Sequence, residues 1–434
     1  MKLQIEKAVY GGAGLAHQTG GESTGKAVFV PFTLPGEIVE ARLLEQKNAF
    51  GEASLLQVLT ASEDRIPPRC THFGQCGGCH YQHAAYPAQV QIKSAILQET
   101  LERAGLTALP AIKTHTGEPW TYRNRTRLRI AELEATLRVG YNKRGSNEFL
   151  AIHECPISAP LVWRAVEALL KIAAESSTMA RWFRDAVEVE LFTTGDEKKL
   201  QMTLFVLKAQ PGFDALCERM RELVPELAGA DISLLPSSEP QRRARSTRSR
   251  ESWGADGLNY RAAGDDYWIS RGGFFQVNRF LVDELVRIVT TGRRGAVAWD
   301  LYAGVGLFSR ALAKAFQQVV AVEAAANDVS RSFKGPGKRA VEATTIEFLR
   351  SAVLQRERPD LIVIDPPRAG VGAEVCALLA RISSPEIVYV SCDPVTLARD
   401  LKLLVAAGYS IAEIHMVDMF PQTFHLETVM ILRR

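Results

Sequence analysis

The final third of the chain contains four short apolar segments, and patterns typical of amphipathic helices separate most of them. The segments cover residues 296–301, 319–323, 360–365 and 387–390. Alternation of strands and helices predicts a doubly wound α/β sheet whose strands are mostly parallel. Ligands of such sheets bind at the carboxyl ends of the strands. The residues that follow each segment therefore define the candidate site.

The first two strand ends carry residues suited to a nucleoside ligand. The first strand runs into Tyr302, and the pair Gly304 and Gly306 follows before the next helix. Such glycines let a ligand approach the backbone closely, but the third glycine of a dinucleotide fingerprint is absent. The second strand ends in Glu323, which suits hydrogen bonding to ribose hydroxyls. The pattern indicates a nucleoside cofactor without a diphosphate, and S-adenosylmethionine is the candidate.

The fourth strand leads into Ser-Cys-Asp-Pro, which places Cys392 at a strand-to-helix junction. Asp393 suits the helix N-cap and Pro394 suits the first helical position. The partial positive charge of a helix N-terminus favours a thiolate. We therefore predict that Cys392 is reactive, although an ordinary core cysteine would also fit this position.

Two acidic residues and one amide complete the candidate site. Asp365, fixed by two following prolines, could accept a hydrogen bond from a planar N–H such as N3–H of uracil, or could simply belong to a tight turn. Glu427 begins the last apolar strand and could act as a general base beside Cys392, or could be a strand-edge charge. Gln276 lies in Phe-Phe-Gln-Val-Asn at the start of the same domain, where an ordinary core or surface role is the alternative.

Four cysteines form a separate candidate site. Cys70, Cys76 and Cys79 have the spacing C-x5-C-x2-C, and Cys155 stands far downstream. Four cysteines can hold a [4Fe–4S] cluster or zinc, and free thiols are the third possibility. The spacing differs from that of a usual zinc ribbon, and the glycines between the first three cysteines suit a loop around a bulky cluster.

Three regions are expected along the chain. Residues 1–61 show short strands split by glycines, which suggests an OB-like β-barrel, with residues 11–16 as a turn. Residues 62–269 form a β-rich central domain that contains the cysteines and a helix at 87–105, which can pack on the catalytic domain. Residues 270–434 form the catalytic α/β domain.

Clusters of arginine, but not the net charge of the whole chain, suggest a polyanionic partner. The net charge of the 434-residue chain is +3, but Arg123, Arg125, Arg127 and Arg129 alternate on one face of a strand, and arginines crowd the loop 241–250. A solvated face is the alternative. No signal peptide and no run of eighteen apolar residues is evident, so we expect a cytoplasmic monomer without a membrane segment.

The motifs FFQVN, DLYAGVG, DPPRAG and SCDP, in this order and spacing, resemble the RNA uracil-5-methyltransferase family. The resemblance covers essentially the whole chain. The N-terminal unit is similar to the TRAM domain of that family, and the cysteine spacing is similar to the [4Fe–4S] site of its 23S rRNA members. The combination of SCDP with the DPPRAG and H-E motifs is specific, whereas the glycine loop is not.

The resemblance implies roles for the site residues. Cys392 is expected to add to C6 of a uridine, which activates C5 toward the methyl group of S-adenosylmethionine. Glu427 is expected to remove the C5 proton, and Gln276, Tyr302, Glu323 and Asp365 match positions around the cofactor and the target base. The substrate is expected to be 23S rRNA, with tRNA as the alternative, and the uridine must be flipped or lie in a splayed loop.

The chain departs from the family pattern at residues 324–345, so no adenine contact is assigned. Two rival functions remain open. An amino-methyltransferase would use Asp365 to hold an exocyclic amine but would have no use for Cys392. A non-catalytic RNA-binding or assembly factor would need neither Cys392 nor Glu427.

Overall fold

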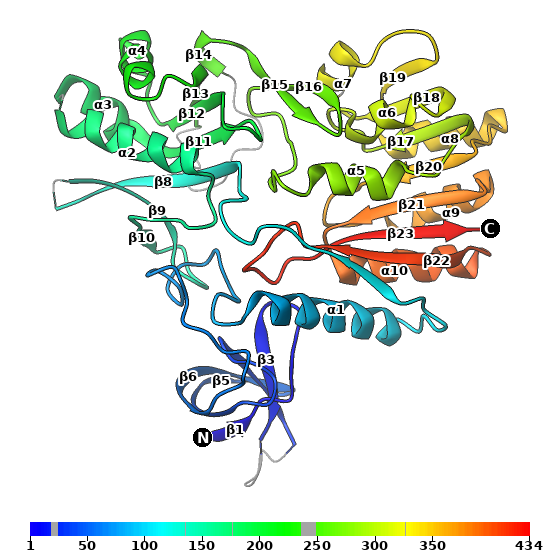
Figure 1. The fold of residues 1–434 in the computed structure, drawn as a ribbon, viewed down its shortest axis with the longest axis horizontal. Helices are drawn as coiled ribbons and strands as arrows, with labels where there is room; N and C mark the ends of the chain where they lie inside the picture. The colour runs from blue at the N-terminus through cyan, green and yellow to red at the C-terminus, as the bar shows by residue number, and fades with distance from the viewer. Residues whose placement is uncertain (19–24, 135, 176, 236–248, 326) are drawn as a thin grey trace.

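The computed structural model describes residues 1–18, 25–134, 136–175, 177–235, 249–325 and 327–434. These residues form three sheets and a hairpin (Figure 1). The N-terminal barrel lies on one side of helix α1 (Tyr86–Arg103), and the catalytic sheet lies on the other. The central sheet lies beside both. Within the described residues, no helix is long and apolar enough to cross a membrane.

The catalytic sheet has eight strands. In spatial order they are β19 (Lys338–Glu342), β18 (Phe316–Glu323), β17 (Gly295–Leu301), β20 (Leu361–Ile364), β21 (Glu386–Ser391), β23 (Glu427–Arg433), β22 (Ser410–Val417) and β7 (Ile112–His115). Every neighbouring pair is parallel except the two that include β23. The predicted mostly parallel α/β sheet is therefore confirmed.

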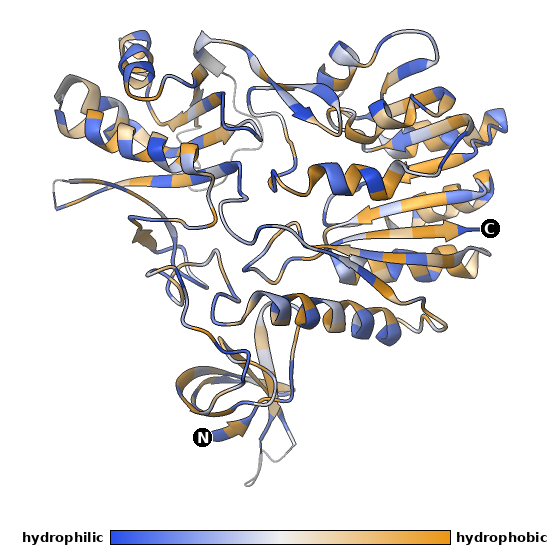
Figure 2. Ribbon diagram, viewed as in Figure 1, coloured by the Kyte–Doolittle hydropathy of each residue, from blue (hydrophilic) through white to orange (hydrophobic). Residues whose placement is uncertain are grey.

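Helices cover both faces of this sheet because its central strands are largely apolar, and β20 is apolar along its whole length (Figure 2). They are α5 (Val282–Thr290), α6 (Leu307–Leu312), α7 (Asn327–Ser332), α8 (Thr345–Gln355), α9 (Gly372–Ile382) and α10 (Pro394–Ala406). Buried residues of α5, α6 and α7 form one core with one face of the sheet. Buried residues of α1, α8, α9 and α10 form the second core on the other face.

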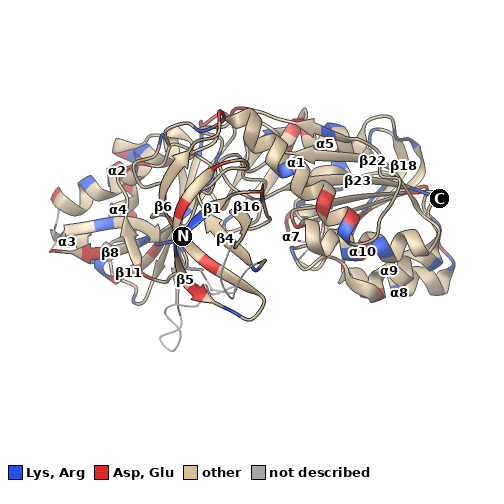
Figure 3. Cartoon of the chain, turned by 90° about the horizontal axis from the view of Figure 1, so that it is seen from below, with Lys and Arg blue, Asp and Glu red and all other residues tan. Residues whose placement is uncertain are grey.

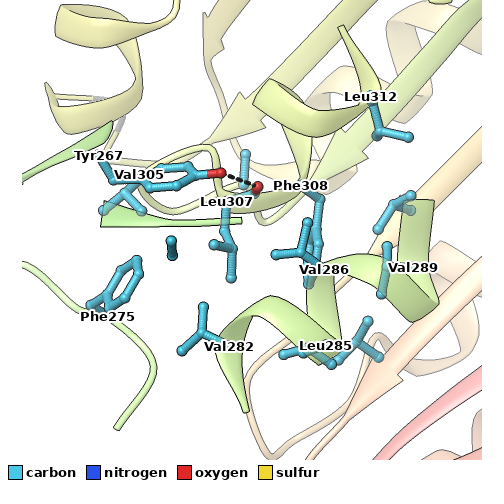
Figure 4. Close-up of a cluster of buried hydrophobic side chains, with 14 of the residues drawn as sticks. Tyr267, Phe275, Val282, Leu285, Val286, Val289, Val305, Leu307, Phe308 and Leu312 are labelled. Atoms are coloured by element: carbon cyan, nitrogen blue, oxygen red, sulfur yellow. Dashed lines mark hydrogen bonds between the residues drawn. The ribbon is translucent and has the colours of Figure 1, made fainter. Parts of the chain in front are cut away.

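Two elements join the catalytic domain from elsewhere in the chain. A hairpin of β15 (Gly257–Ala262) and β16 (Asp265–Ser270) packs into the first core. Figure 4 shows Tyr267 of this hairpin near Val305 and Phe275, with its hydroxyl donating to the carbonyl of Leu307 at 3.0 Å. Helix α1 contributes Leu97 and Leu101 to the second core. The catalytic domain is thus built from separated stretches of sequence.

The N-terminal barrel is a six-stranded sheet around a small apolar core. In spatial order its strands are β1 (Lys2–Gln4), β5 (Ile38–Gln46), β6 (Phe50–Thr60), β4 (Ala27–Pro31), β3 (Ala13–His17) and β2 (Lys7–Ala8). The turn predicted at residues 11–16 is shorter than expected. It ends before β3, because Gly11 and Gly12 supply the positive φ angles and residues 13–17 pair with β4.

The central domain is a seven-stranded sheet covered by three helices. In spatial order its strands are β10 (Phe149–Ala151), β9 (Thr136–Asn142), β8 (Arg125–Leu133), β11 (Ala186–Thr193), β12 (Leu200–Val206), β13 (Leu227–Leu234) and β14 (Ser249–Gly254). The helices are α2 (Pro160–Glu175), α3 (Ser177–Asp185) and α4 (Phe213–Leu223). They share one apolar core with the sheet.

Candidate active site and cysteine cavity

Strand pairing brings Cys392 and Glu427 together. Strands β21 and β23 are antiparallel, and their register pairs Ser391 with Thr428. The next residue beyond each of these two along the ladder is Cys392 on one side and Glu427 on the other. The Thr428 hydroxyl donates to the Ser391 carbonyl at 3.0 Å and strengthens the junction. Two residues predicted as nucleophile and base therefore meet although 35 positions separate them in the sequence numbering.

The helix that follows Cys392 begins as predicted. Asp393 is the N-cap of α10, and its Oδ1 accepts hydrogen bonds from the backbone N–H groups of Val395 and Thr396, both at 3.0 Å. Pro394 occupies the first helical position. These contacts fix the turn that carries the cysteine at the carboxyl end of β21.

Acidic groups crowd the site, and burial determines their protonation. Glu427 is buried, so desolvation and then the charge of Asp365 raise its pKa well above the usual range. Burial and the nearby Asp300 raise the pKa of Asp365 to about 7. Arg368 opposes these effects, because its positive charge lowers the pKa of Glu427. Burial and the neighbouring carboxyl therefore favour the neutral form of Glu427 in the free protein.

In the free protein, the helix N-terminus does not lower the pKa of Cys392. Burial, followed by the charge of Glu427, raises the pKa of Cys392 to about 12. Arg368 lowers it through its charge and a side-chain hydrogen bond, but the net shift is upward. A helix N-terminus contributes about 0.3–1 kcal/mol at an exposed position, which is less than the cost of placing a charge in a desolvated pocket beside carboxylates.

The residues predicted to bind the nucleoside cofactor lie at the carboxyl ends of strands β17 and β18. Tyr302 adopts a left-handed φ of 62° directly after β17. The backbone N–H of Gly304 donates to Oε2 of Glu323 at 2.9 Å, so the two predicted cofactor residues are in direct contact. Asp300 is fully buried, and its Oδ1 has no hydrogen-bond partner among the described residues. Such an unpaired acceptor beside a glycine loop fits a ligand that offers a polar N–H or O–H group.

Gln276 lies in the segment that leads from the β15–β16 hairpin to helix α5. It is buried, and its backbone carbonyl accepts a hydrogen bond from the Asn124 side chain at 3.1 Å. Two residues further on, the Asn278 side chain donates to the Met419 carbonyl at 3.2 Å. The segment is thereby attached to the loop that leads into Glu427.

Sequence reasoning missed Arg368 and His425. Arg368 lies in the DPPRAG motif, and its Nη2 is 3.2 Å from Nδ1 of His425. Burial and then Arg368 lower the pKa of His425 to about 3, so this imidazole is neutral at physiological pH. The signal for Arg368 was its position three residues after Asp365 at a strand end. His425 offered only its proximity to Glu427 in the sequence.

All four predicted cluster cysteines line one cavity of about 510 Å³. Burial and then the charge of Cys155 raise the pKa of Cys79 to about 12, which reflects the proximity of these two thiols. The loop that carries Cys76 is held against the β9–β10 hairpin, where Gly77 N–H donates to the Asn142 carbonyl at 3.2 Å. No group of three or more His, Cys, Asp or Glu side chains within the described ranges is arranged to hold a single metal ion.

The arginine face is largely neutralised. Strand β8 alternates as predicted, with buried Thr126 and Leu128 between half-buried arginines. Arg127 forms an ion pair with Glu188 and lies over the Phe205 ring, and Arg125 lies 3.4 Å from Glu190. Figure 3 shows basic and acidic positions intermixed around β8 and β11. The arginines therefore stabilise the sheet, and less positive charge remains for a polyanion than the sequence indicates.

Arg129 also has partners within the protein: its Nη1 donates to Oδ1 of Asn142 at 2.8 Å. The loop 241–250 that carries the second arginine group falls mostly outside the described residues.

The eight-stranded sheet with its glycine loop and acidic strand end defines a methyltransferase of the class that uses S-adenosylmethionine. The model of the TRAM domain matches residues 3–56, and the model of tRNA (Uracil-5-)-methyltransferase matches residues 337–434. The 23S rRNA (uracil(1939)-C(5))-methyltransferase RlmD of Chromohalobacter salexigens is 32% identical over 100% of this chain and 89% of its own length. An uncharacterized RNA methyltransferase of Halalkalibacterium halodurans is 30% identical over 100% and 96%.

The fold has a solved counterpart. The tRNA (uracil-54, C5)-methyltransferase of Pyrococcus abyssi, crystallised with S-adenosyl-L-homocysteine, superimposes with a TM-score of 0.76 over 100% of both chains at 24% identity. With relatives of this similarity along its full length, the chain belongs to the RNA uracil-5-methyltransferase family.

Proposed function

We propose that this protein transfers the methyl group of S-adenosylmethionine to C5 of a uridine in 23S rRNA. The observation that carries the proposal is the β21–β23 register, which sets Glu427 opposite Cys392. The buried carboxyl of Asp365 lies near both. Full-length similarity to relatives named for 23S rRNA supports this substrate. An amino-methyltransferase would require neither the cysteine nor the paired acid.

The reaction proceeds through a covalent adduct. The Cys392 thiol gives up its proton to solvent as its sulfur bonds to C6, and takes one back when the sulfur leaves at the end; on addition, the C5=C6 electron pair moves to C5 and the neighbouring carbonyl. C5 then takes the methyl group as the sulfonium–methyl bond breaks. The Glu427 carboxylate accepts the C5 proton, the C5=C6 bond re-forms, and the Cys392 sulfur leaves. Atoms and charge balance with one proton released overall.

The electrostatics of the free site fit this order of events. Without ligands, burial raises the pKa of Glu427 and raises that of Cys392 to about 12, which keeps the nucleophile as a thiol. The positive sulfonium of the methyl donor favours the carboxylate forms of Asp365 and Glu427. The base is therefore generated only when the donor is bound. Arg368 contributes the remaining positive charge beside Cys392.

The experiment is methyl transfer from labelled S-adenosylmethionine to separate transcripts of 23S rRNA and of a tRNA pool, followed by mass-spectrometric mapping of the modified nucleoside. We expect 5-methyluridine at one position in the 23S transcript. Equal or exclusive labelling of tRNA would replace the substrate assignment. A methyl group on an exocyclic amine would refute the reaction, and RNA binding without transfer would indicate an assembly factor.

We also propose that Cys70, Cys76, Cys79 and Cys155 bind a [4Fe–4S] cluster. The support is that all four thiols line one cavity and that glycines separate the first three cysteines. Deprotonated thiolates suit such a cluster, and we infer a structural role because uracil methylation involves no net redox change. Protein purified without oxygen should contain about four irons and four sulfides per chain. One zinc per chain, or no metal with four alkylatable thiols, would overturn this assignment.

A further inference from the structure

One residue of the N-terminal barrel reaches the predicted reaction site. Tyr10 follows β2, and its hydroxyl donates to Oδ2 of Asp393 at 3.1 Å across 383 positions of sequence. Asp393 directly follows Cys392. The two carboxylate oxygens of Asp393 have separate partners, because Oδ1 caps helix α10 and Oδ2 faces the barrel.

The ring of Tyr10 contacts the other catalytic segment. It lies edge-on against Phe424, with ring centroids 5.3 Å apart. Phe424 in turn packs against His425 at 4.2 Å, two residues before Glu427. A single side chain therefore touches the segment that carries Cys392 through its hydroxyl and the segment that carries Glu427 through its ring.

The barrel holds Tyr10 firmly in this position. Lys7 Nζ is 2.6 Å from Oε1 of Glu99 on helix α1, and Ala8 is buried in the core that α1 shares with the catalytic sheet. Gly12 has a φ of 86°, and a Cβ atom there would lie 3.0 Å from Cβ of His80. The turn between β2 and β3 thus packs closely against the segment that carries Cys79 and His80. Movement of Tyr10 away from Asp393 would therefore require movement of the barrel.

The hydroxyl acts as a donor at all physiological pH values. Burial and then the charge of Asp393 raise the pKa of Tyr10, so the phenol stays protonated. A hydrogen bond from a neutral donor to a carboxylate is stronger than one between neutral groups. The arrangement is therefore suited to holding the Asp393 carboxylate in one orientation.

We propose that Tyr10 is a positioning residue for methyl transfer, which holds the Cys392 and Glu427 segments in their reactive arrangement. The inference rests on the proposed function of the site. It makes the barrel part of the reaction site as well as a candidate RNA-binding unit. Tyr10 itself forms no bond to the substrate and gives up no proton in this role.

The test compares Tyr10→Phe with Tyr409→Phe. The first variant keeps the ring contact with Phe424 and removes only the hydroxyl. Tyr409 is the matched control, because its hydroxyl donates to the Ser384 carbonyl at 2.9 Å. Ser384 precedes β21, so this hydrogen bond lies at the end of the strand opposite to Cys392. Each variant loses one hydrogen bond donated by a tyrosine hydroxyl, so both are expected to show small losses of thermal stability.

The reaction readout is the rate at which protein becomes covalently attached to a 23S rRNA transcript made with 5-fluorouridine, at saturating S-adenosylmethionine. At saturating protein, Tyr10→Phe should slow attachment about tenfold while the dissociation constants for RNA and donor change less than about twofold. Tyr409→Phe should attach at the wild-type rate.

Three results would overturn the inference. Attachment of Tyr10→Phe at the wild-type rate would show that the hydroxyl positions nothing. Equally slow attachment of Tyr10→Phe and Tyr409→Phe would show that the lower rate results from a general loss of stability. A weaker dissociation constant with a normal saturated rate would make Tyr10 an RNA contact. If wild-type protein itself never attaches, the proposed function fails first, and the inference falls with it.

Discussion

The buried ion pair between Lys93 and Asp418 should dominate the stability of the loop that leads to Glu427. Both side chains are fully buried, and Lys93 Nζ lies 2.6 Å from Oδ1 of Asp418. The same ammonium donates to the Phe420 carbonyl at 2.9 Å. Burial lowers the pKa of Lys93, and Asp418 opposes that shift, so each charge depends on the other.

Replacing Lys93 with Met leaves the Asp418 carboxylate buried without its counter-charge. Loss of one partner of a buried pair costs about 3–5 kcal/mol, whereas exposed pairs contribute about 0–1 kcal/mol. Arg350 and Glu374 form such an exposed pair, with side chains 61% and 51% accessible. Arg350→Met is therefore the matched control, and its expected loss is several-fold smaller.

The assay is urea unfolding of the full chain, followed by far-ultraviolet circular dichroism, for Lys93→Met, Asp418→Leu and the double variant. Each single variant should lose about 3–5 kcal/mol, and the double variant should recover most of that loss because no unpaired charge remains. The reasoning is refuted if Lys93→Met costs no more than Arg350→Met. It also fails if the two single losses simply add.

Four further outcomes follow from the site and the central sheet. Cys392→Ala should bind RNA and donor but transfer no methyl group, and Glu427→Gln should methylate once and accumulate a protein–RNA species visible on denaturing gels. The pKa values of Asp300 and Asp365 are raised to about 7, so the folded state binds their protons more tightly than the unfolded state. Ligand-free protein should therefore lose stability as pH rises from about 4 to 7. Asp300→Asn should flatten this pH profile, as measured by denaturant titrations at each pH. Arg127→Met should lower stability by about 1 kcal/mol and leave the salt dependence of RNA binding unchanged, whereas a flattened salt slope would restore the phosphate-contact interpretation.

Local patterns made the catalytic sheet predictable. The segments 319–323 and 387–390 fall within β18 and β21, because a continuous apolar run is visible without knowledge of its partners. The cap at Asp393 was readable for the same reason, since its hydrogen bonds lie within three residues. The family motifs added the roles of the residues at these strand ends.

Long-range contacts account for what the sequence did not reveal. Strand β7 joins the sheet by pairing with β22, about 300 positions away, and its four residues carry no apolar alternation. The carboxylates that neutralise the β8 arginines lie on β11, some 60 positions downstream. The high pKa of Cys392 depends on burial against Glu427 and other neighbours, which no local pattern records. In the sequence, Tyr10 is recognisable only as the residue before the turn at Gly11 and Gly12, and its contact with Asp393 is not predictable.

The insertion of the central sheet between β7 and the hairpin that precedes α5 has a consequence for engineering. A fragment that starts at residue 270 would retain the cysteine and the acid of the reaction site but would lose α1 from one face and β7 from one edge. The uncovered edge of β22 would then be open to pairing with another chain, a common route to aggregation. A minimal fragment for folding studies should instead keep residues 86–115, joined by a short linker to residues 257–434, so that the sheet retains both its cover and its border strand.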